Sequence, residues 1–122
     1  MILKGDAQHL KVAVVGSRSV KDTHYPELIE VLPIGAGTII SGGAKGADML
    51  GKRYAQEYHL CYEEYPPDYK SFGRGAPMER NRRIVDMADY VVVMWDGRSH
   101  GAAYVIRYCL DTSTPVRVLI CH

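Results

Sequence analysis

Residues 41–48 read SGGAKGAD and carry three glycines in eight positions. The stretch follows the apolar run Thr38–Ile40 and precedes a pattern typical of a helix. A plain connection between a strand and a helix needs only a few residues, so the excess of glycine calls for another explanation. Two similar stretches occur elsewhere, Gly-Ser-Arg at 16–18 and Asp-Gly-Arg-Ser-His-Gly at 96–101.

The segments around these stretches alternate between two kinds. Short apolar and β-branched runs, such as Lys11–Val15 ended by Gly16, are typical of strands buried on both faces. Apolar residues spaced by three and four, clearest from Ala47 to Tyr58, indicate helices. The predicted strands are 11–15, 38–40, 61–65, 90–95 and 116–121, and the predicted helices are 24–32, 47–58, 77–88 and 99–111.

This alternation predicts one domain over residues 1–122 with an α/β, Rossmann-like fold. Strands joined by helices form a parallel sheet with right-handed crossovers, and the helices cover both faces to give three layers. We expect the strand order 3-2-1-4-5, in which the first and fourth strands are central. In such sheets ligands bind beyond the carboxyl ends of the strands, where the strand order reverses. All three glycine-rich stretches follow strands, so we expect them to form one site at that edge.

The composition excludes several classes of protein. With 47% hydrophobic and 24% charged residues, the chain has the make-up of an ordinary globular protein. Its formal net charge is only +1, and because nucleic-acid-binding domains are usually distinctly basic, we do not expect nucleic acid as a partner. No segment approaches the ~20 apolar residues of a membrane helix, and the start lacks a secretory apolar stretch. We therefore expect a cytoplasmic protein without membrane contact.

The cysteines and histidines do not predict a metal site. The cysteines are odd in number, far apart and flanked by apolar or aromatic residues, which favours buried free thiols. The histidines show no metal-ligand spacing, and no cofactor motif is present. The residues concerned are Cys61, Cys109 and Cys121, and His9, His24, His59 and His122.

Residues 41–48 combine two features that favour an anionic ligand. Consecutive glycines let backbone N–H groups turn toward a ligand, and the next helix N-terminus adds a favourable dipole. The glycines alternatively serve only turning and packing, and Lys45 either contacts phosphate or is solvated. Asp48 either complements the helix dipole or binds a ribose hydroxyl. The predicted ligand-binding residues here are Ser41, Gly42, Gly43, Lys45, Gly46 and Asp48.

The ends of the first and fourth strands supply further candidates. Arg18 at a strand's carboxyl end suits bidentate binding of phosphate or carboxylate. Ser99 can cap the last helix, with glycines on either side that leave room for close approach of an anion. The candidates in these two loops are Gly16, Ser17, Arg18, Asp96, Gly97, Ser99 and Gly101.

The helix predicted at 77–88 has one polar residue in its inward stripe. That stripe comprises positions 77, 78, 81, 84, 85 and 88, and Asn81 is its polar member. A buried amide must be hydrogen-bonded, so Asn81 either ties down a loop or faces the ligand. We expect one of the arginines at 80, 82 and 83 to point into the site and the others to be solvated.

Five motifs in a fixed order resemble the YspA-type branch of the SLOG superfamily, over about residues 11–121. This superfamily includes the LOG phosphoribohydrolases, which activate cytokinins, and the Rossmann-like domain of the DNA-processing protein DprA. The motifs are Val-Val-Gly-Ser-Arg at 14–18, Ile-Ile-Ser-Gly-Gly-Ala-x-Gly-Ala-Asp at 39–48, Tyr-Pro-Pro-Asp-Tyr at 65–69, Arg-Asn-Arg-x-Ile-Val-x-x-Ala-Asp at 80–89 and Trp-Asp-Gly-x-Ser-x-Gly at 95–101.

The resemblance implies a Rossmann-like fold whose glycine loops bind nucleotides or nucleotide-derived ligands, often in a dimer. It also places Arg80 and Asn81 on a ligand-binding Arg-Asn motif. LOG enzymes carry Pro-Gly-Gly-x-Gly-Thr-x-x-Glu in the second glycine loop, and here we match the threonine to Ala102 and the catalytic glutamate to Tyr104. We therefore predict no catalytic residue, and whether the protein is an enzyme stays open.

These observations favour a domain that binds or senses a nucleotide-derived small molecule. Two alternatives remain: a hydrolase of a nucleotide N-glycosidic bond, and a DprA-like binder of single-stranded DNA. We also expect a homodimer, because a sheet this small leaves apolar helix surface over and the many tyrosines suit an interface.

Overall fold

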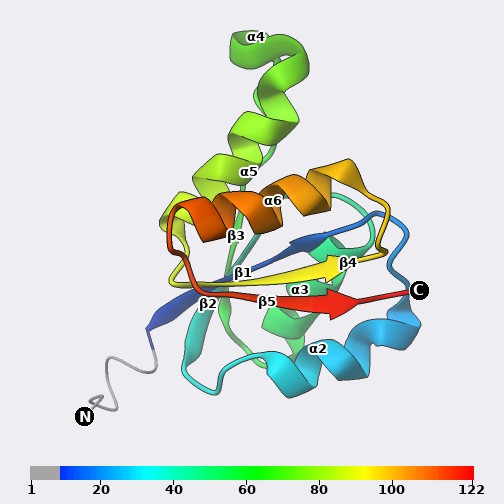
Figure 1. Ribbon diagram of the computed structural model, residues 1–122. Coiled ribbons are helices and arrows are strands. Elements are labelled where there is room, and N and C mark those ends of the chain that lie inside the picture. The colour runs from blue at the N-terminus through cyan, green and yellow to red at the C-terminus, as the bar shows by residue number, and fades with distance from the viewer. Residues whose placement is uncertain (1–8) are drawn as a thin grey trace.

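The structure is a computed structural model that describes residues 9–122. A sheet of five parallel strands lies at its centre, in the order β3-β2-β1-β4-β5 (Figure 1). This confirms the predicted fold class and strand order. The strands are β1 (Leu10–Gly16), β2 (Ala36–Ser41), β3 (Cys61–Glu64), β4 (Tyr90–Trp95) and β5 (Val116–Ile120).

The two central strands are buried on both faces. Every residue from Val12 to Val15 in β1 and from Val91 to Met94 in β4 is buried. Successive side chains of a strand point to opposite faces, so such strands need a covering layer on each side. The alternation of apolar residues along the chain thus leads directly to a three-layer arrangement.

Helices from different parts of the chain cover the two faces of the sheet. One face packs against α2 and α3, and the other packs against α5 and α6 (Figure 1). A short 3-10 turn, η1 (Asp22–His24), leads into α2. The helices are α2 (Tyr25–Val31), α3 (Ala47–Glu57), α5 (Ala76–Met87) and α6 (His100–Asp111).

The segment between β3 and α5 contains structure that we did not predict. Residues 66–75 lie between the predicted strand at 61–65 and the predicted helix at 77–88, and they include the short helix α4 (Tyr69–Phe72) and the 3-10 turn η2 (Gly73–Gly75). The Asp68 side chain caps α4, because its Oδ1 atom accepts a hydrogen bond from the Ser71 N–H at 3.1 Å. Together with the first turns of α5, α4 forms an arm that projects from the body of the protein (Figure 1).

The inward face of α5 also differs from the prediction. Arg80, rather than Asn81, is the buried polar residue, and the other buried residues of α5 are Ala76, Ile84 and Val85. Asn81 is only half-buried. Ile84 and Val85 are buried as expected, but in the preceding turns the buried positions are 76 and 80 instead of 77 and 81. Arginine is normally assigned to the solvent face unless its partners are known.

The structure also bears on the predictions for the cysteines and for membrane-spanning helices. Cys109 and Cys121 are buried free thiols as expected, but Cys61 is exposed because it begins the edge strand β3. Across residues 9–122, no helix is both long enough and apolar enough to cross a membrane.

Candidate functional site

A cavity of about 470 Å³ opens at the carboxyl edge of the sheet, beyond β1 and β4. Small-molecule sites typically occupy about 300–1,000 Å³, so the cavity has room for one such ligand. It lies where the strand order reverses, as the sequence predicted. Its walls are formed by Val15, Gly16, Arg18, Ser19, Ala44, Asp48, Pro77, Met78, Arg80, Asn81, Asp96, Ser99, Gly101, Ala102 and Val105.

Ser17 joins the three loops beneath the cavity. Its N–H donates to the Met94 carbonyl at 2.9 Å, and its hydroxyl oxygen accepts from the Asp96 N–H at 3.0 Å. Its carbonyl oxygen accepts from the Ala47 N–H at 3.2 Å. The loops after β1, β2 and β4 are therefore bonded together through one buried residue.

Gly46 makes the contact between two of these loops possible. Its φ angle is +85°, a conformation that residues with a side chain rarely adopt. A Cβ atom added there would lie 2.4 Å from the Ser17 carbonyl oxygen. Glycine is thus required both by the backbone conformation and by the close approach of the neighbouring loop.

Asp48 and Arg80 hold the glycine-rich loop from both sides. The Asp48 Oδ2 atom accepts hydrogen bonds from the N–H groups of Gly42 at 3.0 Å and Ala44 at 3.2 Å. The Arg80 Nη1 atom donates to the Gly42 carbonyl at 3.0 Å and to the Tyr65 carbonyl at 3.2 Å. A Cβ atom on Gly42 would lie 2.4 Å from Nη1, so the loop can be held this tightly only with glycine there.

Burial dominates the electrostatics of this pair. It raises the pKa of Asp48 to about 6, although Arg80 and the two loop N–H groups act in the opposite direction. Burial also lowers the pKa of Arg80 from its usual value. The Arg80 Nε atom donates to the Asn81 Oδ1 atom at 2.8 Å, which orients that amide at the cavity wall. Asp48 and Arg80 are therefore both structural supports of the loop and charged groups facing the cavity.

The opposite wall is built on Asp96 and the N-terminus of α6. The Asp96 Oδ2 atom accepts from the Ser19 hydroxyl at 2.7 Å, and Oδ1 accepts from the N–H groups of Arg98 and Ser99, each at 2.8 Å. The Ser19 hydroxyl and these backbone donors hold the pKa of Asp96 well below its usual range. Ser99 caps α6 as predicted, with its hydroxyl oxygen accepting from the Ala102 N–H at 3.3 Å.

The predicted site residues fall into two groups. Those that line the cavity are Gly16, Arg18, Asp48, Arg80, Asn81, Asp96, Ser99 and Gly101. The others lie in the same loops, or at the end of β2, but do not line it: Ser17, Ser41, Gly42, Gly43, Lys45, Gly46 and Gly97. Sequence reasoning missed Ser19 and Ala44, which lie within or beside the predicted motifs, and the apolar wall of Val15, Pro77, Met78, Ala102 and Val105.

The match of Tyr104 to the catalytic glutamate of the LOG pattern is wrong by one residue. Tyr104 lies outside this cavity, in a separate groove with Trp95, and its hydroxyl oxygen accepts from Arg82 at 3.0 Å. The spacing Thr-x-x-Glu, counted from Ala102, instead reaches Val105, which is buried and lines the cavity. Neither residue is a carboxylate, so the departure from the LOG pattern remains.

The fold is that of a Rossmann-like α/β protein, and its cavity lies at the point where the strand order reverses. Neither the protein-family models nor the curated proteins give a match to this sequence. Among solved structures, the chain is similar to DNA processing protein A from Helicobacter pylori, with a TM-score of 0.68 and 24% identity. The match covers 98% of this chain and 68% of that chain, and at this identity it shows a shared fold.

This similarity contradicts the expectation that nucleic acid is not a partner. The similar structure was determined for its single-stranded DNA binding mode. Our expectation rested on a net charge of +1, but a sum over the whole chain does not describe the charge of one surface. The expected homodimer is a separate point, and it remains a prediction.

Proposed function

We propose that the cavity binds a nucleotide or a nucleotide-derived ligand. The observation that carries this proposal is the mixture of groups around one cavity: two guanidinium groups, two carboxylates and an apolar wall. Guanidinium groups bind phosphate, carboxylates accept hydrogen bonds from sugar hydroxyls, and apolar side chains can pack against a base. The carboxylates would repel a simple anion, and a purely apolar ligand would leave the charged groups without hydrogen-bond partners.

The phosphate is assigned to the space between Arg18 and the first turn of α6. Arg18 is exposed and lines the cavity. The first N–H groups of a helix have no acceptor within the helix. In α6 the N–H of Ala102 already donates to the Ser99 hydroxyl oxygen. The N–H groups of His100 and Gly101 are then available to a phosphate, in the favourable field of the helix dipole.

The sugar and base are assigned to the other side. Asp48 uses Oδ2 for the glycine loop, so its second carboxylate oxygen is available for a ribose hydroxyl. The base then lies against Pro77 and Met78 at the start of α5.

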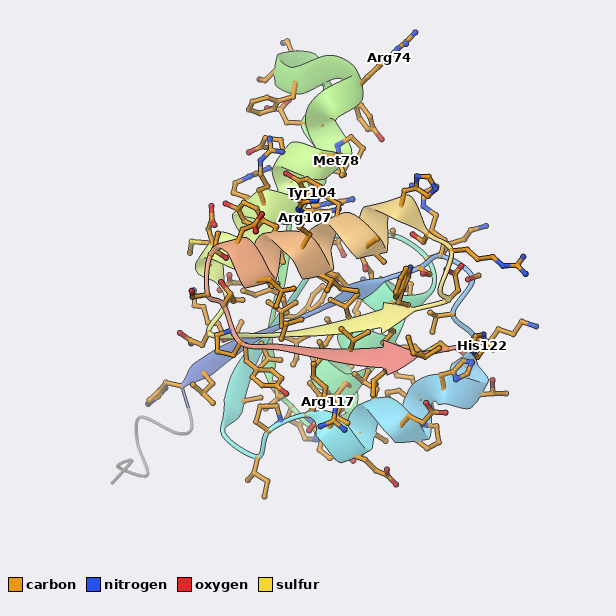
Figure 2. The ribbon with its side chains drawn as sticks, in the orientation of Figure 1. Arg74, Met78, Tyr104, Arg107, Arg117 and His122 are labelled. Carbon is orange, nitrogen blue, oxygen red and sulfur yellow. The ribbon has the colours of Figure 1, made fainter. Side chains whose placement is uncertain are left out.

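Calorimetric titration of the protein with adenine, guanine, cytosine and uracil mononucleotides and with ADP-ribose tests this proposal. Arg18→Gln should weaken binding of the preferred ligand about tenfold or more, because it removes charge-assisted hydrogen bonds. Arg117→Gln is the matched control, since Arg117 is exposed on β5, on the side of the molecule nearest α2 (Figure 2). Absence of binding to all these ligands, or equal losses in both variants, would refute the proposal.

A second candidate, single-stranded DNA, is favoured by the residues of α4 and η2 on the arm that projects from the body of the protein (Figure 1). Tyr69 and Phe72 on this arm are 58% and 49% exposed, and they are accompanied by Lys70 and by Arg74, which projects outward at its tip (Figure 2). Exposed aromatic rings beside basic groups suit stacked bases and a phosphate backbone. The structure similar to this chain, described for its binding of single-stranded DNA, supports the same candidate.

Fluorescence anisotropy with labelled oligothymidylate at ~150 mM salt separates the two candidates. Binding that the substitution Phe72→Ala weakens, and that mononucleotides do not compete away, would favour single-stranded DNA. Mononucleotide binding without oligonucleotide binding would favour the small-molecule ligand. Phe72→Ala removes an exposed ring, so it should leave the fold intact.

A further inference from the structure

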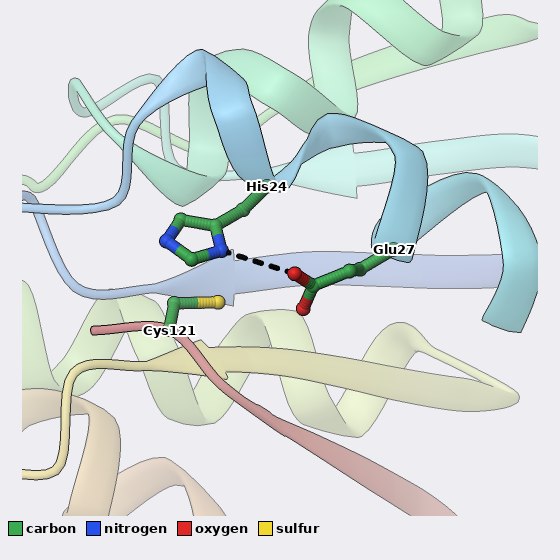
Figure 3. A group of neighbouring side chains, drawn as sticks. All are labelled: His24, Glu27 and Cys121. Carbon is green, nitrogen blue, oxygen red and sulfur yellow. Dashed lines mark hydrogen bonds and ion pairs between the residues drawn. The ribbon is translucent and has the colours of Figure 1, made fainter.

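Three potential metal ligands meet at a place separate from the cavity. His24 at the end of η1, Glu27 in α2 and Cys121 directly after β5 each offer one ligand atom, and these atoms lie within 4.8 Å of one another. Figure 3 shows the imidazole and the carboxylate facing each other, with the thiol pointing toward the gap between them. None of the three lines the candidate ligand cavity.

The two ligands of the first helical turn are already at the separation that a metal requires. The His24 Nδ1 atom lies 3.3 Å from the Glu27 Oε1 atom. Two atoms bound to one tetrahedral zinc ion at about 2.0–2.3 Å are about 3.3–3.8 Å apart. The Glu27 side chain is exposed, so its carboxylate can move toward the sulfur.

The second ring nitrogen of His24 has the partner expected of a metal-binding histidine. Its Nε2 atom lies 3.2 Å from the backbone carbonyl oxygen of His122. When Nε2–H donates to that carbonyl, Nδ1 carries the lone pair, which is the form that binds metals. In that form the Nδ1 lone pair faces the Glu27 carboxylate oxygen, and a metal ion can bridge these two acceptors in place of the proton that joins them in the metal-free pair.

Cys121 supplies the ligand that gives the site its selectivity. Its side chain is 2% exposed, and burial raises the pKa of this thiol to about 11, so it is not a free nucleophile. A sulfur ligand combined with imidazole and carboxylate suits zinc and similar ions, whereas calcium and magnesium prefer oxygen alone.

We propose that His24, Glu27 and Cys121 bind Zn²⁺ or a similar transition-metal ion, with water completing the coordination. The ion would join the end of β5 to the segment that follows the Arg18 loop, and so tie together two parts of the chain far apart in sequence. Spacing along the sequence could not reveal this site, because Cys121 is 94 residues beyond Glu27. The proposal does not depend on the proposed function.

Titration of the chain with Co²⁺, in the presence of a reductant without thiol groups, tests the proposal. We expect one ion per chain, a thiolate-to-cobalt charge-transfer band, and loss of that band when Zn²⁺ displaces the cobalt. Cys121→Ser should abolish the band, whereas Cys61→Ser, which removes the exposed thiol, should leave it unchanged.

His24→Gln and Glu27→Gln provide a second measurement that does not disturb a buried side chain. Each should weaken Co²⁺ binding about tenfold or more, because each removes a direct ligand. A missing band, a band that survives in Cys121→Ser, or affinities unchanged in both glutamine variants would overturn the proposal.

Discussion

Replacement of Asp48 by asparagine tests whether burial, or pairing with Arg80 and the loop N–H groups, dominates the pKa of this carboxyl group in the cavity wall. Both loop N–H groups that bind Asp48 converge on the same carboxylate oxygen, Oδ2. The amide oxygen of asparagine can take that position and accept both hydrogen bonds. Asp48→Asn should therefore keep the loop of residues 41–48 in place while removing a buried negative charge.

The expected magnitude follows from the pKa of the carboxyl group. Burial raises the pKa of Asp48 from 3.8 to about 6, despite the opposing effect of Arg80. Each pKa unit is worth about 1.4 kcal/mol, so ionisation of this buried group costs the folded state about 3 kcal/mol. Because the folded pKa lies above the unfolded one, the favourable contribution is present below about pH 4 and is lost as pH rises through about 6.

Urea unfolding of the wild type and of Asp48→Asn, from about pH 4 to about pH 7, measures this effect. Relative to the wild type, the free energy of unfolding of the variant should rise by about 2 kcal/mol over that range, most of the full effect. Asp111→Asn, which changes an exposed carboxylate at the end of α6, is the control and should show a much smaller pH dependence. A constant difference between Asp48→Asn and the wild type, or one that falls with pH, would show that Arg80 and the loop N–H groups outweigh burial.

Three further predictions concern the same loops. Gly46→Ala should lower the free energy of unfolding by about 2 kcal/mol or more in urea titrations, because it combines a positive φ with a clash against Ser17, whereas Gly75→Ala has open space and should be nearly neutral. Asp96→Asn should remove a contribution to stability that is present above about pH 4 and lost at lower pH, since hydrogen bonds depress the pKa of Asp96; equal acid sensitivity of both proteins would contradict this. Chromatography of AMP incubated with the protein should show no free adenine above background, and release that Asp48→Asn or Asp96→Asn eliminates would instead indicate a hydrolase.

The sequence predicted the framework of the fold because its strongest patterns are local. Apolar β-branched runs such as Val12–Val15, each followed by glycine or a polar turn, mark strands that are buried on both faces. Glycines at the ends of β1, β2 and β4 then placed the site at one edge. Arg18, Asp48, Asp96 and Ser99 line the cavity at that edge, because they lie in the loops and first helical turns that follow parallel strands. Their role in ligand binding remains a prediction.

The prediction failed where long-range partners decide the outcome. Arg80 is buried because the carbonyl groups of Gly42 and Tyr65, from two other segments, accept its hydrogen bonds, and periodicity within α5 cannot show this. The helix α4 has only four residues, too few for a periodic pattern to be recognised. The net charge likewise said nothing about where Lys70 and Arg74 gather on the surface.

Ser17 bonds its own loop to the loops that follow β2 and β4, and this has a consequence for the rate of ligand binding. A crevice whose walls are joined at their base has little freedom to open and close, so the free and occupied shapes should be nearly the same. Association then needs no slow rearrangement, and its rate should rise in direct proportion to ligand concentration without reaching a plateau. Differences in affinity between competing ligands would then come from their dissociation rates.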